Sequence, residues 1–465
     1  MSEPSLAIDI GASSGRHILG WVENGRIVTE EVYRFPNGSF EKDGHLYWDA
    51  DALLNHVLSG MSKCRGRSVR TVGVDTWGVD YALIGEDGQR LGDCAAYRDG
   101  RTAGMDERLE RTLPFAELYA RTGIAKQPFN TVYQLMSEPP ERLRAARRCL
   151  FTPDYLHYRL TGRMANEYTI ASTSGLLNAR TKRWDAETLA AAGIPAHLFP
   201  EEPIAPGALL GPLLPECADR VGYSCQVALP ASHDTGSAYL AVPAKSANAV
   251  YLSSGTWSLL GVELTEPVLT EGARQARFTN EGSYGGSIRF LQNIMGLWML
   301  QQIRHEWNDR LSFAEMADLA AGAADFAATV DVTDNRFLAP QSMAREVCAA
   351  LTEAGAPVPA SDAQLLACVT RSLAAGYAKA IRELEALTHR RFDCIHVVGG
   401  GSNNRVLNQW TADASGLPVH AGPGEGTALG NLMAQLIARG IFADAAEARQ
   451  ALRESVPLTV YLPAR

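Results

Sequence analysis

Short apolar runs that alternate with polar residues mark the beginning of the chain as a series of β-strands. The stretch "HILGWVENGRIVTEEVYRF" (residues 17–35) alternates in this way, and Asn24-Gly25 inside it is typical of a two-residue hairpin turn. Ahead of it, "AIDIGASSGR" (residues 7–16) carries an apolar run into a Gly- and Ser-rich turn. We therefore expect an N-terminal β-hairpin with that turn as its tip.

The rest of the first half combines another strand pattern with helices. The stretch 71–92, "TVGVDTWGVDYALIGEDGQRLG", predicts strand, tight turn and strand, with Glu86-Asp87-Gly88 closing a second hairpin. Over 105–123 and 152–162 the apolar residues take helical spacing. The Pro- and Gly-rich stretch 200–216 then predicts irregular loops.

The opening pattern returns near residue 250. The stretch "AVYLSSGTWSLLGVEL" (residues 249–264) again places a small Ser/Gly turn between two apolar strands. One such turn alone is more often an ordinary β-turn than a binding site. Two copies, one in each half, predict two related domains that face each other, with an anionic ligand held where the two turns meet.

A third glycine-rich turn lies near the end of the chain. In "CIHVVGGGSNNRVLNQWTADASGLPV" (residues 394–419), a β-branched strand runs into Gly399-Gly400-Gly401, and Ser402-Asn403-Asn404 then caps a helix. Glycines of this kind allow either a flat ring or a packed helix to approach the backbone. The helix expected over 424–440 is rich in small residues and is interpreted as a packing element.

Asp234 is the acid best placed for chemistry. It follows a strand-like run in "ALPASHDTGSAYLAV" (residues 228–242), beside His233 and Thr235, at an expected strand-to-helix junction. A carboxylate next to a hydrogen-bonding histidine can serve as general base for a hydroxyl group. The alternative is that Asp234 or Thr235 simply caps the helix.

Composition narrows the class of protein. A chain of 465 residues favours two large domains, and a net charge of -9 without a basic stripe argues against nucleic acid or an anionic membrane as the main partner. The sequence has no apolar run of membrane-spanning length and no signal-peptide pattern at its start, so we expect a cytoplasmic protein. The eight cysteines are scattered without a CxxC pair, which favours reduced structural thiols while leaving an occasional disulfide open.

The first turn is not a Walker A loop, because Arg16 stands where that motif needs a lysine.

Taken together, the motifs resemble those of the FGGY family of carbohydrate kinases, and within it the rhamnulokinase subfamily. The resemblance spans nearly the whole chain in the order "AIDIGASSGR", "VDTWGVDYALI", "AYRDGRT", "YRLTG", "ASHDTGSA", "YLSSGTWSL", "NIMGLWMLQ" and "VVGGGSNN". Glycerol and xylulose kinases typically carry Gly-Asp-Gln where this chain has His233-Asp234-Thr235. That difference favours the rhamnulokinase subfamily.

The resemblance implies an α/β fold of two related actin/hexokinase-like (ribonuclease H-like) domains, with an ATP and sugar cleft between them. The expected N-terminal domain is 1–243, with sugar binding, the first phosphate hairpin and the catalytic Asp. The expected C-terminal domain is 244–465, with ATP and adenosine binding. Oligomeric state cannot be inferred from the sequence.

The resemblance also assigns roles to individual residues. Asp234 is the expected catalytic base and Asp9 the expected Mg²⁺ ligand. The residues expected to bind the sugar are Gly78, His233, Asp234, Thr235 and Asn293. Those expected to bind ATP are Ala12, Ser13, Ser14, Gly15, Arg16, Thr256, Gln301 and Gly400.

The implied reaction transfers the γ-phosphoryl group of ATP to the 1-hydroxyl of L-rhamnulose, giving L-rhamnulose 1-phosphate and ADP, with Mg²⁺ as the metal. Two alternatives remain. One is an FGGY kinase for another ketose, such as L-fuculose or L-xylulose. The other is a non-catalytic, actin-type nucleotide-clamping module, which would have no need of a base at Asp234.

Overall fold

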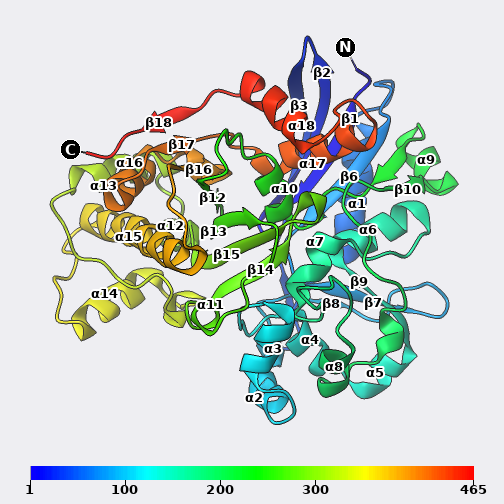
Figure 1. Ribbon diagram of the computed structural model, residues 1–465, viewed down its shortest axis with the longest axis horizontal. Coiled ribbons are helices and arrows are strands. Elements are labelled where there is room, and N and C mark those ends of the chain that lie inside the picture. Colours follow the sequence, from blue (N-terminus) through cyan, green and yellow to red (C-terminus); the bar gives the residue numbers. More distant parts are fainter. Residues whose placement is uncertain (1, 465) are drawn as a thin grey trace. The chain divides into compact units, whose positions relative to one another are not determined.

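The computed structural model describes residues 2–464, and its internal contacts divide the chain into two compact units (Figure 1). The first unit comprises Met1–Ala241, Glu263–Phe290 and Thr427–Ser455. The second comprises Val242–Val262, Leu291–Gly426 and Val456–Arg465. The first unit therefore includes two segments of the predicted C-terminal domain, 263–290 and 427–455.

A six-stranded sheet organises the first unit, in the order β10-β11-β6-β1-β2-β3. β1 pairs antiparallel with β2 and parallel with β6, which in turn is parallel to β11. Every residue of β1 and β6 is buried, as in the central strands of a sheet that is covered on both faces. The strands are β1 (Ser5–Ile10), β2 (Ser14–Glu23), β3 (Arg26–Pro36), β6 (Thr71–Thr76), β10 (Leu209–Pro212) and β11 (Gln226–Ala228).

The two predicted N-terminal turns are confirmed. Asn24 and Gly25 both have positive φ, 50° and 78°, as a tight hairpin turn between β2 and β3 demands. The Gly/Ser turn joins β1 to β2 and is closed by the amide of Gly11, which donates to the carbonyl of Ser14 at 2.9 Å.

The predicted hairpin over 71–92 is correct at its turn and wrong in its strand pairing. The amide of Gly85 donates to the carbonyl of Gln89, and Ile84 bridges Arg90. The main partner of β7 (Tyr81–Gly85), however, is the distant β9 (Ala146–Phe151). β7 is buried throughout, so it pairs with a second apolar strand that local patterns cannot identify. A further small sheet holds β4 (Phe40–Lys42), β5 (His45–Trp48) and β8 (Cys94–Ala95).

Alternation along β1 divides its side chains between two layers. Leu6, Ile8 and Ile10 enter the large core that also contains residues of α1 and α6. Ala7 faces the other way, into a cluster with Ala428 and Leu432 of α17. Helix α17 therefore covers the opposite face of β1 within the same unit (Figure 1).

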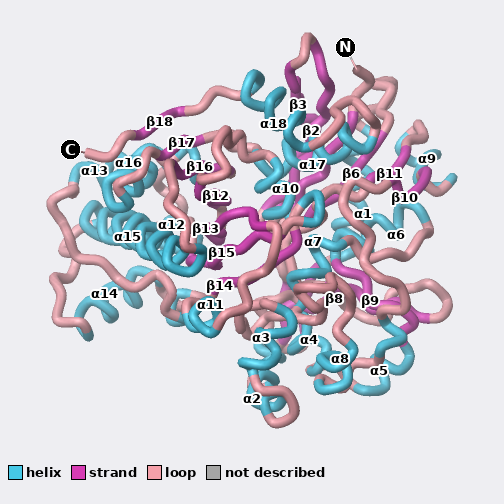
Figure 2. The backbone as a smooth tube through the Cα atoms, in the orientation of Figure 1, coloured by secondary structure: helices cyan, strands magenta, loops and turns pink. Residues whose placement is uncertain are grey.

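The helices expected over 105–123, 152–162 and 424–440 are confirmed, and Figure 2 shows how helices and loops follow the strands. The helices of the first unit are α1 (Ala50–Ser62), α2 (Met105–Glu110), α3 (Phe115–Thr122), α4 (Thr131–Met136), α5 (Pro140–Ala145), α6 (Thr152–Thr161), α7 (Tyr168–Ala171), α8 (Ala186–Ala191), α9 (Pro215–Val221), α10 (Asp234–Leu240), α11 (Glu271–Gln275), α17 (Gly426–Ala438) and α18 (Ala445–Ser455).

The second sheet has the order β14-β15-β13-β12-β16-β17-β18. β12 pairs antiparallel with β13 and parallel with β16, which is parallel to β17. This is the pairing of β1 with β2, β6 and β11, so the repeat predicted at residue 250 is confirmed in the topology. The strands are β12 (Ala249–Ser254), β13 (Trp257–Leu264), β14 (Phe278–Gly282), β15 (Ile288–Met295), β16 (Cys394–Val398), β17 (Val419–Ala421) and β18 (Thr459–Tyr461).

Most helices of the second unit lie between β15 and β16 in the sequence. The helices of this unit are α12 (Trp298–Glu306), α13 (Phe313–Gly322), α14 (Met343–Glu353), α15 (Asp362–Thr388) and α16 (Arg405–Ser415).

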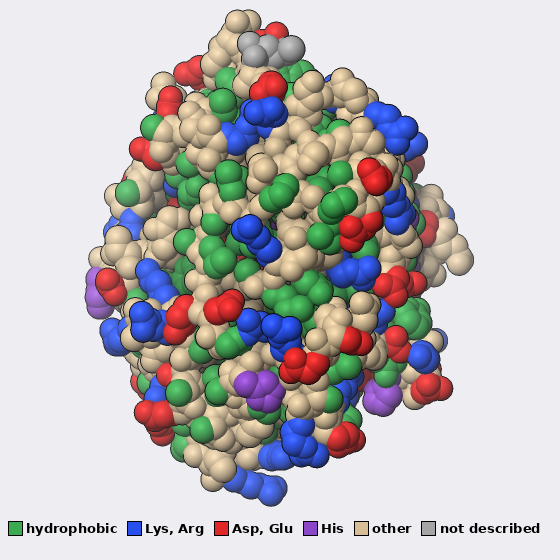
Figure 3. Space-filling view, turned by 90° about the vertical axis from the view of Figure 1, so that its right-hand side faces the viewer, with side chains coloured by type: hydrophobic (Ala, Val, Ile, Leu, Met, Phe, Trp, Pro, Cys, Tyr) green, Lys and Arg blue, Asp and Glu red, His purple; other side chains and the backbone are tan. Residues whose placement is uncertain are grey.

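On the face drawn in Figure 3, acidic and basic side chains are interspersed without a large patch of one sign. None of the helices within residues 2–464 combines the length and apolar character that a membrane span needs.

Candidate active site

The turn between β1 and β2 has its carbonyl groups engaged by the protein. Asn37 donates from Nδ2 to the carbonyl of Gly11 at 2.8 Å and from its amide to the carbonyl of Ser13 at 3.0 Å. Within residues 2–464, the amides of Ala12 and Ser13 find no acceptor. Free backbone N–H groups at a tight turn are suited to anionic oxygens.

The other predicted residues of this turn differ in what surrounds them. A Cβ on Gly15 would lie 2.2 Å from the ring of Phe35, so packing alone requires glycine there. Arg16 faces Asp9 across the hairpin, with 3.3 Å between Nε and Oδ2. Asp9 is almost fully buried at the end of β1.

Asp75 on β6 is a neighbour of Asp9 that the sequence analysis did not select. The two residues are register partners on adjacent parallel strands. Burial raises the pKa of Asp75 well above its ordinary value, and the charges of Asp9 and Asp234 raise it further. The three carboxyl groups thus lie close enough in the first unit to influence one another's protonation.

Helix α17 supplies polar groups to this region. Asn431 donates from Nδ2 to Oδ2 of Asp75 at 2.6 Å and to the carbonyl of Gly73 at 3.1 Å. Gln435, one turn later, donates to the carbonyl of Leu6 at 2.9 Å. The interpretation of residues 424–440 as a packing element was incomplete; the signal was two amide side chains four residues apart in an otherwise apolar helix.

The region is compatible with Mg²⁺. Carboxylate oxygen is the ligand that this ion prefers, and it commonly takes one or two carboxylates while phosphates and water complete its shell. Asp9 provides such a group, beside the acidic Asp75 and Asp234. In residues 2–464 no group of three His, Cys, Asp or Glu side chains forms a complete protein cage.

The junction between β11 and α10 places the predicted acid and its neighbours together. His233 is the N-cap residue of α10 and Asp234 is its first residue, so Asp234 is not the N-cap, although its Oδ1 accepts from the first-turn amide of Thr235 at 2.5 Å. The Asp234 side chain is 29% exposed and accepts a hydrogen bond from Oγ1 of Thr235 at 3.1 Å. Its Oδ1 lies 3.4 Å from Nε2 of His233.

Gly78 lies against the same histidine. A Cβ at this position would be 3.2 Å from Nε2 of His233 and 3.4 Å from Oγ1 of Thr173. The structure therefore brings Gly78, His233, Asp234 and Thr235 into one part of the first unit. Val79, which the sequence analysis missed, follows with a φ of 70°, a strained conformation for a β-branched residue.

The strained turn is held from behind by Asp80. Its Oδ2 accepts from Nε1 of Trp48 at 2.6 Å and Nε1 of Trp77 at 2.9 Å, and its Oδ1 accepts from Nε2 of Gln134 at 2.9 Å. Burial raises the pKa of Asp80 to about 6 despite these donors. Thr131 Oγ1 adds a hydrogen bond to the carbonyl of Val79 at 2.7 Å.

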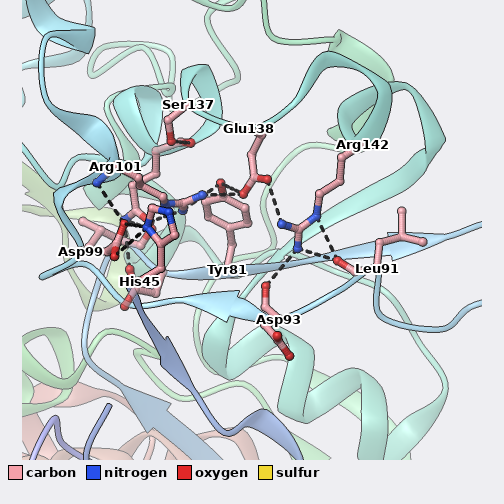
Figure 4. Close-up of polar contacts among 12 residues, drawn as sticks. His45, Tyr81, Leu91, Asp93, Asp99, Arg101, Ser137, Glu138 and Arg142 are labelled. Atoms are coloured by element: carbon pink, nitrogen blue, oxygen red, sulfur yellow. Dashed lines mark hydrogen bonds and ion pairs between the residues drawn. The ribbon is translucent and has the colours of Figure 1, made fainter. Parts of the chain in front are cut away.

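Arg101, from the "AYRDGRT" motif, hydrogen-bonds the residues around Asp80 (Figure 4). It donates to Oε1 of Glu138 at 2.7 Å and to Oε1 of Gln134 at 2.9 Å. Tyr81 and Arg142 donate to the same Glu138 carboxylate. This motif thus supports the turn after β6, a role that its sequence alone did not indicate.

The remaining predicted residues belong to the second unit. Thr256 occupies the turn between β12 and β13, where its carbonyl accepts from the amide of Trp298 at 3.1 Å. Asn293 is on β15 and Gln301 on α12.

The three glycines after β16 have different surroundings. A Cβ on Gly399 would lie 2.9 Å from the carbonyl oxygen of Ser254, and one on Gly401 would lie 1.9 Å from its Oγ. A Cβ on Gly400 would meet nothing within 4 Å. Gly399 and Gly401 therefore serve close packing, while Gly400 presents open backbone.

Family models match both halves of the chain. Residues 5–241 match the N-terminal domain of the FGGY family of carbohydrate kinases, and residues 250–439 match its C-terminal domain. The chain is 44% identical over 465 residues to a rhamnulokinase of Halalkalibacterium halodurans, covering 99% of both chains. It is 42% identical over 461 residues to a rhamnulokinase of Bacillus subtilis, covering 98% of this chain and 95% of the relative.

Solved structures show the same fold at low sequence identity. A ligand-bound xylulose kinase from Lactobacillus acidophilus has a TM-score of 0.79 at 16% identity, covering 99% of this chain and 94% of that one. A glycerol kinase from Plasmodium falciparum with ADP has a TM-score of 0.77 at 13% identity and the same coverage. The predicted two-domain α/β fold is confirmed.

Proposed function

Since the chain belongs to the FGGY family of carbohydrate kinases, we propose that it transfers the γ-phosphoryl group of ATP to the 1-hydroxyl of L-rhamnulose. Support comes from the rhamnulokinases that match it over nearly their whole length. Within the molecule, the observation that carries the proposal is the group formed by His233, Asp234 and Gly78.

In this proposal Asp234 accepts the proton of the 1-hydroxyl as the hydroxyl oxygen attacks phosphorus. Its carboxylate is partly exposed, and a hydrogen bond from Thr235 directs it. Gly78 leaves room for the sugar beside His233, whose ring can hydrogen-bond a hydroxyl group. The general base is geometrically available, as proton transfer requires. Asn293 and Thr235 are the further proposed sugar contacts.

The proposed nucleotide contacts start at the first turn. The free amides of Ala12 and Ser13 would bind phosphate oxygens, together with Ser14, Gly15 and Arg16. Thr256, Gln301 and Gly400 of the second unit are the other proposed ATP contacts, and the open backbone at Gly400 is compatible with a flat ring.

Asp9 is the proposed ligand of Mg²⁺, which supplies charge stabilisation to the phosphates when bound. The work left to the chain is to align donor and acceptor and to keep water away. A non-catalytic, actin-type nucleotide-binding module would have no use for a carboxylate beside His233 and Gly78, where Asp234 lies. A kinase of the same family for another ketose remains the second candidate.

The test is an ADP-release assay with MgATP and a panel of L-rhamnulose, L-fuculose, L-xylulose, D-xylulose and glycerol. We expect L-rhamnulose to give the highest kcat/KM. If L-fuculose or L-xylulose were the better substrate, the substrate assignment would be wrong while the kinase would stand.

A further inference from the structure

Two buried residues of opposite charge lie behind His233. Arg289, at the start of β15, is fully buried, and Glu281 of β14 has a side chain only 6% exposed. Nη2 of Arg289 lies 3.0 Å from Nδ1 of His233 and 3.1 Å from Oε2 of Glu281. All three residues belong to the first unit. None of the roles derived above uses Arg289 or Glu281.

The chemistry of arginine determines which nitrogen of His233 carries the proton. A guanidinium group has N–H donors and no acceptor, and it stays protonated. A hydrogen bond between Arg289 and Nδ1 therefore requires Nδ1 to be the acceptor. In a neutral imidazole with Nδ1 as acceptor, Nε2 bears the hydrogen.

Glu281 balances the charge of Arg289 and lies close to the same nitrogen of His233. Its Oε2 is 3.3 Å from Nδ1 of His233, yet this oxygen has no partner with hydrogen-bond geometry within residues 2–464. Burial acts to raise the pKa of Glu281, but the guanidinium of Arg289 acts in the opposite direction, and the pKa lies below its ordinary value. Glu281 is thus an anion that neutralises the guanidinium.

The position of Arg289 is itself fixed. Its Nε donates to the carbonyl of Gly282 at 2.8 Å, and its guanidinium carbon lies 6.0 Å from the centre of the Tyr239 ring. On the other side, the amide of His233 donates to Oγ1 of Thr169 at 3.2 Å, and that hydroxyl donates to the buried Glu167 at 2.6 Å. The imidazole is therefore held at its backbone and at Nδ1.

Only Nε2 of the ring faces the proposed chemistry. It lies 3.4 Å from Oδ1 of Asp234 and next to the space in front of Gly78. An Nε2–H group there can donate to the carboxylate of Asp234 or to a sugar hydroxyl, whereas an unprotonated Nε2 can donate to neither. The tautomer of His233 hence decides whether the ring can donate a hydrogen bond to Asp234.

We propose that Arg289, paired with Glu281, is a positioning residue that keeps His233 in its neutral Nε2–H tautomer and directs that hydrogen toward Asp234 and the sugar. The part that concerns the sugar rests on the proposed function. The tautomer itself does not, because it follows from contacts inside the first unit.

The tautomer can be measured without any substrate. The protein is labelled with ¹⁵N-histidine, and the ring nitrogens are observed through their long-range couplings to ring protons from pH 6 to 8. The His233→Gln variant identifies the resonances of this residue. In the neutral ring we expect an unprotonated Nδ1 and a protonated Nε2. A neutral ring with its hydrogen on Nδ1 would overturn the proposal.

Kinetics then test the part played by Arg289. In Arg289→Met, Nδ1 is free to donate to Glu281, so we expect the Nδ1–H form to appear. We expect kcat for L-rhamnulose to fall about 10- to 100-fold, by analogy with metal-bound histidines that lose their orienting partner. ATP binding, measured separately, stays within twofold. Arg289→Lys, which keeps a charged donor, recovers part of kcat and tests the proposal should the Met variant fail to fold.

Arg90→Met is the matched control. Arg90 also bonds one carbonyl and one carboxylate, those of Gly92 and Asp51. We expect wild-type kcat and an unchanged His233 spectrum in this variant. An Arg289→Met protein with a wild-type spectrum and wild-type kcat would refute the role of Arg289. The expected tautomer without turnover of L-rhamnulose would instead refute the proposed substrate.

Discussion

Asn431 of α17 donates a hydrogen bond of 2.6 Å to the carboxyl group of Asp75, 356 residues earlier in the chain. Because Asp75 is fully buried beside Asp9, this bond satisfies a polar group that has little else to accept from. It links the packing of α17 to the acidic region of the candidate site.

Asn431→Leu should therefore destabilise the first unit. The substitution leaves Oδ2 of Asp75 and the carbonyl of Gly73 without their donor, at a cost of about 1–3 kcal/mol each. We expect the melting temperature to fall by several degrees. Thr427→Ala, a half-buried position on the same helix, is the control; equal melting temperatures for the two variants would contradict the assigned bond.

Asp234→Asn should abolish most of the turnover, because the amide preserves shape but cannot accept the hydroxyl proton. The expected loss in kcat is about 10²- to 10⁴-fold, with ATP binding and the melting temperature nearly unchanged. Asp185→Asn is the control, since Asp185 caps α8 by accepting from the amide of Thr188. A kcat within a few-fold of wild type for Asp234→Asn would remove Asp234 from the mechanism.

Substitutions of the glycines after β16 should affect different properties, stability for Gly401 and the KM for ATP for Gly400. Gly401→Ala places a methyl group on the Ser254 hydroxyl and should lower the melting temperature. Gly400→Ala has open space and should melt like wild type, while raising KM for ATP and leaving KM for the sugar unchanged. Normal KM values for Gly400→Ala would mean that no adenosine contacts this backbone.

Stability should decline as the pH falls below about 6.5, in part through His157. Its Nε2 accepts from the amide of Val74 at 3.1 Å, and burial lowers the pKa of the ring to about 3. Between pH 6.5 and 3 the unfolded chain therefore takes up a proton that the folded chain does not, so acid favours unfolding by about 1.4 kcal/mol per pH unit.

The measurement is urea unfolding of the wild type and of His157→Gln at pH 7.5 and 5.5, followed by tryptophan fluorescence. The glutamine oxygen can accept from Val74 without taking up a proton, so its pH dependence should be shallower by one proton. Identical slopes for His157→Gln and wild type would show that His157 is protonated in the folded protein.

Local patterns were sufficient for the two hairpins with Gly/Ser turns, the junction at Asp234 and the helices over 105–123 and 152–162. Each depends on neighbours in the sequence: a turn residue with positive φ, a change of apolar period, a helix start. The duplicated order of strands was also visible, because the same strand-turn-strand pattern occurs twice.

Residues that act across long separations were not visible. Asp75, Asn431 and Arg289 carry no local motif, and their roles depend on which strands and helices pair in space. The pairing of β7 with β9 belongs to the same class. In each case a buried polar or apolar group finds its partner only after the chain has folded.

The cover that α17 provides for β1 sets an order for biosynthesis. Ala7 and the carbonyl of Leu6 emerge from the ribosome at the start of translation, but Leu432 and Gln435 follow more than 400 residues later. At about 5–20 residues per second, roughly 20 to 90 seconds pass between the synthesis of β1 and the synthesis of α17, which covers this face of the strand. During that interval the nascent chain exposes an apolar strand surface, which makes it a candidate for chaperone binding until the last helices are released.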